Sequence, residues 1–402
     1  MLPEGWKKTS LEDIAEVRSG IAKGQKSVTN PINLPYLRVA NVQDGYLDLT
    51  EVKTIEIDKE KVERFSLHTG DVLMNEGGDF DKLGRGDVWR GQITPCLHQN
   101  HVFAVRPDQE KLDSYFLANL SASPYGKGYF LSCAKRSTNL ASINSTQLKQ
   151  FPVVLPPLPE QKKIAAILST WDRAIEGTEK LLANSQQQKK ALMQQLLTGK
   201  KRLPGFTGEW KICSLSDVAT VQTATSKTQY ICENGERFIV DMGSVNRLGN
   251  LVCTKSTQHN ADLLPKGTLV MPKDDIGGGN IIGRTSYIDR DDLYVLGDHV
   301  YALHIGDCDS KFLHFLINSH PINKNLRRRA NGTAQLGLGK KDVLRQKIKI
   351  PSEFSEQKAI AAVLTTADKE ITAIESDLSH LRQEKKALMQ QLLTGKRRVR
   401  VD

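Results

Sequence analysis

The feature that most constrains this chain is an internal repeat of one long segment. Residues 160–202 align without a gap on residues 356–398, at a constant offset of 196 positions, and 26 of the 43 aligned residues are identical. The end of the first copy, Lys189 to Lys200, recurs letter for letter as Lys385 to Lys396. A repeat of this length indicates a duplicated architecture, in which two parts of the chain fold in similar ways.

The sequences that precede the two copies are much less similar. Matches persist at Trp6 and Trp210, and at the tetrapeptides that begin at His101 and His299. A chain of 402 residues is long enough for two or more domains. We therefore predict two related globular blocks and two long helices, arranged as a first block at 1–158, a helix at 159–199, a linker at 200–209, a second block at 210–354, a helix at 355–395 and a basic tail at 396–402.

Each repeated segment has the composition of a long helix. Residues 160–198 contain no proline and one glycine, and Gly199 suits a left-handed C-terminal cap. Apolar positions recur every 3.5 residues in both copies, which predicts that the two helices pack on each other as a coiled coil. The alternative is two surface helices, each packed on its own block. The predicted seam consists of Ile164, Leu168, Trp171, Ile175, Leu182, Leu192 and Leu196, with Ile360, Leu364, Ile371, Ile374, Leu378, Leu381, Leu388 and Leu392.

The connectivity predicts that the two helices are antiparallel. The short linker places the second block at the C-terminal end of the first helix, so the second helix has to run back toward the first block. At about 1.5 Å per residue, each helix would be about 58 Å long. The predicted fold class is α+β, with two mixed α/β domains in a pseudo-two-fold arrangement, separated by two long antiparallel helices that form a coiled coil.

Within the blocks, short runs of β-branched and aromatic residues predict strands, and the longer apolar runs predict helices. The strands are expected at 36–42, 101–105, 238–241 and 299–304, and the helices at 114–121 and 311–318. Long polar loops that are rich in glycine connect them, notably at 76–86 and 274–284.

Composition narrows the class of protein. The chain carries 56 Lys and Arg against 46 Asp and Glu, a net charge of +10, which favours a polyanionic partner. The six cysteines are scattered without a C-x-x-C pair, so we expect reduced thiols and no metal site. The N-terminus lacks the pattern of a signal peptide, and no apolar run approaches the length of a membrane span. We therefore expect a cytoplasmic protein with no membrane association.

The known catalytic motifs are missing or incomplete. Leu338-Gly339-Lys340-Lys341 contains the Gly-Lys pair of a phosphate loop without the rest of that motif. Asn33-Leu34-Pro35-Tyr36 is similar to the N-P-P-Y tetrapeptide of amino-methyltransferases, but a leucine replaces the first proline and no glycine-rich cofactor loop accompanies it. The nine histidines are dispersed. We predict no catalytic residue, no metal ligand and no cofactor in this chain.

The glycine-rich loops carry side chains that suit DNA. Arginine pairs well with guanine edges, Asn and Gln pair with adenine, and lysine binds phosphates. For any single residue the alternative is a solvated surface charge, but such loops recur at matching places in both blocks. The candidate DNA-binding residues are Lys23, Gln25, Lys26, Lys82, Arg85, Arg90, Lys135, Arg136 and Asn139 in the first block, and Lys227, Lys273, Asn280, Arg284, Arg327, Arg328, Arg329, Asn331 and Gln335 in the second.

Several motifs resemble the specificity subunit of Type I restriction-modification systems. They are Leu2-Pro3-Glu4-Gly5-Trp6, the segment 34–42, the segment 154–161 with its tandem prolines, and Gln194-Gln195-Leu196-Leu197-Thr198-Gly199. The resemblance covers the whole chain. The second copy departs from it, because residues 350–357 lack the tandem prolines.

The resemblance implies a division of labour among subunits. It implies that the two blocks are target-recognition domains, each reading one half of a bipartite asymmetric DNA site. The helical pair would set the spacer between the half-sites and dock two modification (methyltransferase) subunits. S-adenosylmethionine, ATP and Mg would be bound by partner subunits, which include the restriction and translocase subunits. This chain would be non-catalytic.

Two other classes of function compete with this interpretation. One is a scaffold whose helical hairpin recruits proteins without sequence-specific DNA contact. The other is the recognition half of a fused methyltransferase-nuclease, although the two repeats leave no room for a catalytic domain. Methyl transfer by the isolated chain would favour that enzyme.

The arginine run of the second block gives a first prediction. Replacing Arg327, Arg328 and Arg329 by alanine should weaken DNA binding and reduce its salt dependence, because fewer counterions would be released from the phosphates. The measurement is a titration with duplex DNA at several salt concentrations. An unchanged salt dependence would remove this run from the interface.

Overall fold

The computed structural model describes residues 2–24, 29–78, 80, 83–136, 138, 140–276, 278–332 and 335–401. These residues form two compact units. Unit 1 comprises residues 1–179 and 376–402, and unit 2 comprises residues 180–375. The division falls within the two long helices, so each unit contains one globular block together with half of each helix.

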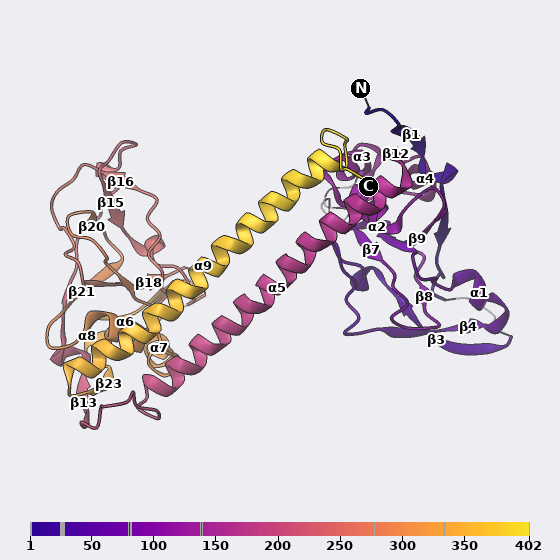
Figure 1. Cartoon of the computed structure of the whole chain (residues 1–402). Coiled ribbons are helices and arrows are strands. Elements are labelled where there is room, and N and C mark those ends of the chain that lie inside the picture. The colour runs from indigo at the N-terminus through magenta and orange to yellow at the C-terminus, as the bar shows by residue number, and fades with distance from the viewer. Residues whose placement is uncertain are drawn as a thin grey trace. The chain divides into compact units, whose positions relative to one another are not determined.

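The two globular blocks, which Figure 1 draws with the two long helices, are built from sheets with the same strand order. In unit 1 the four-stranded antiparallel sheet has the order β2-β9-β5-β7, and in unit 2 it has the order β14-β21-β17-β19. A three-stranded sheet accompanies each, β4-β3-β8 and β16-β15-β20, and in both its central strand pairs one neighbour antiparallel and the other parallel. The duplication seen in the sequence of the helices therefore extends to the blocks.

The strand bounds are as follows. In unit 1 they are β1 (Lys7–Ser10), β2 (Ala15–Ser19), β3 (Pro31–Leu37), β4 (Lys53–Asp58), β5 (Val72–Asn75), β6 (Gly77–Gly78), β7 (Gly86–Val88), β8 (Leu97–His98), β9 (Val102–Pro107), β10 (Lys135–Arg136), β11 (Ala141–Ser142) and β12 (Pro152–Leu155). In unit 2 they are β13 (Trp210–Ser214), β14 (Ala219–Gln222), β15 (Arg237–Val240), β16 (Ser256–Thr257), β17 (Leu269–Pro272), β18 (Asp274–Asp275), β19 (Ser286–Tyr287), β20 (Tyr294–Leu296), β21 (Val300–Ile305), β22 (Leu336–Gly337) and β23 (Lys347–Pro351).

Short helices accompany the sheets of each block, and two helices are much longer. The short ones are α1 (Val62–Phe65), α2 (Ser114–Ala122), α3 (Pro124–Cys133) and α4 (Ser145–Lys149) in unit 1, and α6 (Ser310–Asn318), α7 (His320–Arg328) and α8 (Lys340–Leu344) in unit 2. The long ones are α5 (Leu158–Leu196) and α9 (Phe354–Leu392). Helices α2 and α6 agree with the sequence prediction, whereas α3 and α7 were not predicted because proline and glycine interrupt their apolar pattern.

One strand prediction was wrong in its second half. Strand β3 ends at Leu37, and residues 39–41 form a turn of 3₁₀ helix. The cause is Asn41, whose side-chain oxygen accepts a hydrogen bond from the Arg38 backbone N–H at 2.9 Å. Its amide nitrogen also donates to two backbone carbonyls, those of Asp48 and Glu51. These local bonds satisfy the backbone in a turn and remove the need for a strand partner.

Within each unit, the two long helices lie side by side and run antiparallel (Figure 1). In unit 1, Lys385 of α9 binds Asp172 of α5, while Arg382 binds Glu179 at 2.6 Å. The residue numbers therefore fall along α9 as they rise along α5. In unit 2, the repeat equivalent Lys189 forms the same ion pair with Asp368. The antiparallel direction and the mixed α/β blocks of the predicted fold class are confirmed.

Burial alternates along both long helices, as expected for a helix pair. All of the predicted seam residues are buried or half-buried, whereas most residues between them are exposed. The ends of both helices also enter the block cores. Ile164 and Leu168 of α5 and Leu392 of α9 belong to the core of unit 1, and Leu196, Ile360 and Leu364 belong to that of unit 2. Both packing modes that the sequence suggested are thus present in one pair of helices.

A buried Glu-Gln dipeptide fixes the start of each long helix. In unit 1, Gln161 is fully buried, and its side-chain oxygen accepts the backbone N–H of Asp113 at 2.9 Å. Asp113 is the N-cap of α2, so the start of α5 is bonded directly to a helix of the block. In unit 2, Gln357 makes the equivalent bond to Asp309, the N-cap of α6, at 2.8 Å.

The glutamate of each dipeptide binds an arginine that follows the other long helix. Arg398, beyond α9, makes two hydrogen bonds to Glu160 at 2.9 and 3.1 Å. Arg202, beyond α5, makes two to Glu356 at 2.5 and 2.7 Å. Both glutamates are buried. Because a buried carboxylate is costly unless it is paired, each joint holds the end of one helix against the start of the other.

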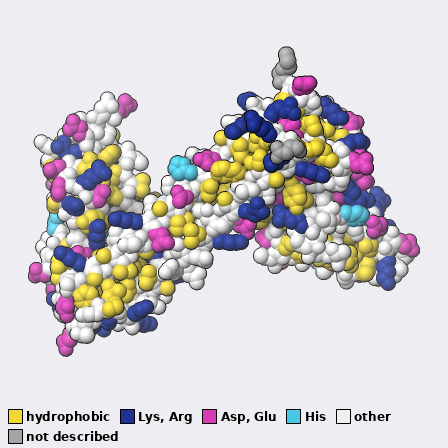
Figure 2. All heavy atoms as spheres, in the orientation of Figure 1, with side chains coloured by type: hydrophobic (Ala, Val, Ile, Leu, Met, Phe, Trp, Pro, Cys, Tyr) yellow, Lys and Arg dark blue, Asp and Glu magenta, His cyan; other side chains and the backbone are white. Residues whose placement is uncertain are grey.

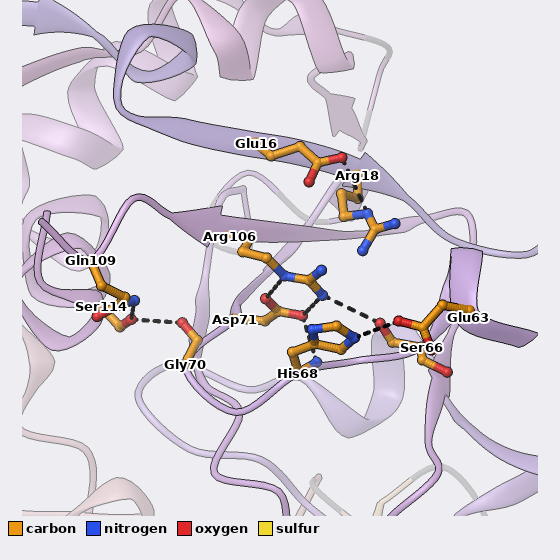
Figure 3. Close-up of polar contacts among 10 residues, drawn as sticks. All are labelled: Glu16, Arg18, Glu63, Ser66, His68, Gly70, Asp71, Arg106, Gln109 and Ser114. Carbon is orange, nitrogen blue, oxygen red and sulfur yellow. Dashed lines mark hydrogen bonds and ion pairs between the residues drawn. The ribbon is translucent and has the colours of Figure 1, made fainter. Parts of the chain in front are cut away.

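A second buried ion pair lies inside the unit 1 block (Figure 3). The Asp71 carboxylate, which is 1% exposed, accepts two hydrogen bonds from Arg106 at 2.8 and 2.9 Å. It also accepts the backbone N–H of His68. The hydrogen bonds that Arg106 donates to Asp71 raise the pKa of Arg106. This cluster links the turn before β5 to β9, and in unit 2 the corresponding contact is a longer one between Thr268 and His304.

The helix joints can be tested by limited proteolysis. In Glu160→Gln the tie to Arg398 is weakened, so trypsin should remove the C-terminal tail roughly tenfold faster, because cleavage follows the fraction of opened segment. In Glu356→Gln the accelerated site should instead be the linker around Arg202. Mass spectrometry of the fragments distinguishes the two. Glu384→Gln, at an exposed position of α9, is the control, and equal acceleration of both sites in either variant would contradict this assignment.

The Asp71 cluster can be tested by unfolding. Asp71→Ala leaves the Arg106 charge without its buried partner, so the free energy of unfolding should fall by about 3 kcal/mol. Urea unfolding followed by near-UV circular dichroism measures it. Asp108→Ala, which breaks the exposed pair with Lys111, should cause little change. Equal effects of the two substitutions would show that burial does not strengthen the pair.

Candidate nucleic-acid interface

The first candidate surface is a hollow of about 510 Å³ in unit 1, next to the short sheet β10-β11-β6. It brings together two of the predicted residues, Lys135 and Arg136, both exposed. Arg136 is steadied by a hydrogen bond to the Leu131 carbonyl at 2.7 Å. Gly77 permits the close pairing of β6 with β11, because a Cβ there would lie 2.7 Å from the Ala141 carbonyl oxygen.

A histidine-carboxylate pair lines this hollow, and an equivalent pair occurs in unit 2. The Nδ1 atom of His101 is 2.6 Å from Glu76, and both residues line the hollow. In unit 2, His299 Nδ1 is 2.6 Å from Asp274. Each pair connects the start of the long strand β9 or β21 to the glycine-rich loop. The two histidines align in the sequence, but no local pattern indicates the pairs, because each carboxylate lies 25 residues before its histidine.

The second candidate surface is a groove of about 1250 Å³ in unit 2. Its walls are α7, the glycine-rich loop, and the parts of α5 and α9 that belong to this unit. Three predicted residues line it, namely Arg284, Arg327 and Arg328. Seven Lys and Arg side chains and two carboxylates line it in all, so it is strongly positive. The additional bases are Lys189, Lys190, Lys200 and Lys324, none of which is among the DNA-binding residues predicted from the sequence.

The remaining predicted DNA-binding residues differ in their burial and in their contacts. Lys227 is 5% exposed and its ammonium group is bound to Asp262 at 2.7 Å, so we leave it out of the proposed interface. Arg329 donates to the Asp342 carbonyl at 3.1 Å and therefore also supports α8. Arg90 stays exposed beside Asp87. Lys23, Asn331 and Gln335 are exposed, and Arg85, Lys273 and Asn280 are half-buried. Gln25, Lys26, Lys82 and Asn139 lie outside the described residues.

Basic side chains also gather around the C-terminus in Figure 2, beside the N-terminal part of unit 1. Lys396, Arg397 and Arg400 of the predicted basic tail are exposed. Arg398 differs from them, since its guanidinium is bound to Glu160 and to the Glu4 carbonyl. The tail therefore contributes both surface charge and one structural bond.

The titratable groups of the described residues give no sign of nucleophilic or metal chemistry. The six cysteines are free thiols, and burial raises the pKa of Cys96 and Cys308 to about 12. Burial lowers the pKa of His98 and His314 to about 4, so both are neutral at pH 7. No cluster of three potential ligands for a metal is found among the described residues. None of the described helices is long and apolar enough to cross a membrane.

Comparison with known sequences gives matches over almost the whole chain. The model of the Type I restriction modification DNA specificity domain matches residues 3–184 and 207–380. A putative type I restriction enzyme MjaX specificity subunit of Methanocaldococcus jannaschii is 27% identical, over 99% of this chain and 95% of that protein. The EcoKI specificity subunit of Escherichia coli is 25% identical, over 51% of this chain and 44% of that protein.

Comparison with solved structures gives the same fold. The S subunit of a Type I restriction-modification system from M. genitalium superimposes with a TM-score of 0.62 at 14% identity, over 96% of both chains. A chain from a structure of type I R-M complex assembly and conformational transition gives a TM-score of 0.61 at 16% identity, over 99% of this chain and 100% of that one.

Proposed function

The chain belongs to the family of Type I restriction-modification DNA specificity proteins and is a DNA sequence-recognition subunit, and we propose that each of its units reads one half of a bipartite, asymmetric DNA site. The observation that carries the proposal is the pair of basic surfaces on equivalent blocks. The strand order is the same in both units, whereas the residues that line the two surfaces differ. Equivalent scaffolds with different side chains suit the reading of different sequences.

In this proposal, lysine and arginine side chains position each block on the phosphates, and a smaller set reads base edges. Lys135 and Arg136 serve in unit 1, and Arg284, Arg327 and Arg328 serve in unit 2. The groove in unit 2 is about twice the volume of the hollow in unit 1. We therefore expect unit 2 to bury more of its half-site.

The long helices serve two further roles in the proposal. Their antiparallel pairing sets the spacer between the half-sites, and they dock two methyltransferase subunits. S-adenosylmethionine is bound by those subunits, and ATP and Mg by the restriction and translocase subunits, so that this chain supplies specificity and performs no chemical step. A docked methyltransferase then extracts its target adenine from the duplex. The compartment is the cytoplasm, where the host DNA lies.

A protein scaffold without DNA contact remains the competing function. It is supported by the paired helices, whose exposed faces offer room for partner helices. The positive charge of the groove in unit 2 favours the DNA reader, because a protein-recruiting hairpin has no need of seven bases around a groove of its globular block. A gel-shift titration with random-sequence duplex, using the chain assembled with its methyltransferase subunits, separates the two.

The spacer role can be tested by lengthening both helices together. Inserting one heptad after Lys180 in α5 and one after Ser376 in α9, which are repeat equivalents, keeps the seam in register. The insertion adds about 10 Å, so the spacer should grow by about three base pairs while both half-sites stay the same. Methylome sequencing of a host that expresses the whole system reads the half-sites and the spacer.

The matched control inserts the heptad in α5 alone. This variant breaks the pairing register, so it should reduce methylation without producing a new spacer. An unaltered spacer in the double insertion, with methylation retained, would contradict the proposed role of the helices.

A further inference from the structure

One wall of the groove in unit 2 is formed by an unusually close approach of a loop to α7. Gly283 has a positive φ of 69°, and a Cβ at this position would lie 2.9 Å from the Cβ of Leu326. Only glycine permits this approach. Because Arg284 follows Gly283 and Arg327 follows Leu326, the contact brings two arginines together.

Among the described residues, neither of these two arginines has a carboxylate partner. Arg284 donates from Nη1 to the Asn318 carbonyl at 2.8 Å, and its Nε is buried without an acceptor. The guanidinium of Arg327 makes no hydrogen bond or ion pair with a described residue, and its Nη2 lies 3.4 Å from the position a Cβ on Gly279 would take. Burial and the charge of Arg327 both lower the pKa of Arg284. Two like charges held in this way repel each other, and an anion between them would remove the repulsion.

A third donor without an acceptor lies at the same place. Asn323 is 3% exposed and lines the groove one helical turn before Arg327. Its side-chain Nδ2 has no hydrogen-bond partner, and it lies 3.5 Å from the position a Cβ on Gly283 would take. Buried donors without acceptors are costly and therefore rare. Two of them near Gly283, Arg284 Nε and Asn323 Nδ2, together with the exposed guanidinium of Arg327, leave a place for a ligand that supplies only acceptor oxygens.

The volume and the charge of the groove indicate the class of this ligand. Its volume of about 1250 Å³ exceeds that of a usual small-molecule pocket, about 300–1000 Å³. Seven basic side chains line it, and one of its two acids, Asp368, is already bound to Lys189. A long polyanion fits these charges better than a small anion does.

We propose that Arg284, Asn323 and Arg327 form a phosphate-binding site, and that a backbone phosphodiester of bound duplex DNA occupies it. The inference rests on the proposed DNA-reading function and assigns one phosphate contact to these residues. Arg284 is held in place by the carbonyl at the end of α6. Arg327 is exposed and has no hydrogen-bond or ion-pair partner among the described residues, so its side chain is free to orient toward a bound phosphate.

Unit 1 contains only half of this site. Gly84 also has a positive φ and lies against α3, where a Cβ would meet the Phe130 ring at 2.4 Å. Arg85 follows it, and its Nε is likewise buried without an acceptor. However, Leu131 occupies the position that Arg327 has in unit 2. The two-arginine site is therefore specific to unit 2.

The alternative role for Arg284 is purely structural, because an arginine at the C-terminal end of a helix is stabilising. The two roles differ in what Arg327 does. A cap on α6 does not involve Arg327, whereas a phosphate site requires it. Arg327→Gln alters an exposed side chain without structural bonds, so this variant should fold normally.

The experiment uses the full chain assembled with its methyltransferase subunits and a labelled random-sequence duplex. Affinity is measured at several salt concentrations for the wild type, Arg327→Gln and Arg284→Gln/Arg327→Gln. One lost phosphate contact should reduce the slope of log affinity against log salt by about 0.9 in both variants. Arg290→Gln, which removes an exposed charge of unit 2 outside the groove, is the matched control and should keep the wild-type slope.

The outcomes separate this inference from the proposed function. A wild-type slope in both variants overturns the phosphate site while leaving DNA recognition intact, whereas failure of the wild-type complex to bind DNA overturns both. If the slope is unchanged but the variants bind less methyltransferase subunit on size-exclusion chromatography, the ligand is a protein carboxylate and the inference is wrong. If inorganic phosphate raises the Tm of the wild type only, again with an unchanged slope, the site binds free phosphate and the assignment to DNA is wrong.

Discussion

The structure depends on two buried Glu-Gln dipeptides, one at the start of each long helix. The glutamine bonds the helix to the N-cap of a helix in its own block, and the glutamate bonds it to an arginine beyond the other long helix. A buried carboxylate is stabilising only while it is paired. In each unit, the helix joint is therefore made by residues that lie far apart in the sequence. In unit 1 these residues are Glu160 and Arg398, so the C-terminal segment of this chain belongs to unit 1.

This constraint explains the uneven divergence of the two copies. The repeated segments supply the seam, the ion pairs and the joints, so a change on one helix would have to be matched on the other. A change in a loop of a block needs no matching change elsewhere, because the sheets fix the two ends of each loop. Glycines mark the exceptions: Gly84 and Gly283 keep the same close approach to a helix, even though the residues around them differ. A rigid frame with free loops is what a DNA-reading subunit requires.

Burial also decides which of the basic residues can act. Lys227 and Arg202 look like surface charges in the sequence, yet both are bound to carboxylates in the structure. Arg284 and Arg327 look no different from them, but they line a groove and have no carboxylate partner in the described part of the chain. The total number of basic residues in the sequence is therefore a poor indicator of DNA binding. Whether a basic residue has a buried carboxylate partner is a better one.

The sequence by itself determined the duplication, the presence of two long helices and their antiparallel direction, because periodicity and a short linker are local properties. It also identified the loops that carry basic residues. Only the tertiary structure decided which of these residues meet. The Arg284-Arg327 pair depends on a contact between a glycine and a helix 43 residues later, and the Glu160-Arg398 joint on one across most of the chain. Such long-range contacts follow from packing, which no local pattern encodes.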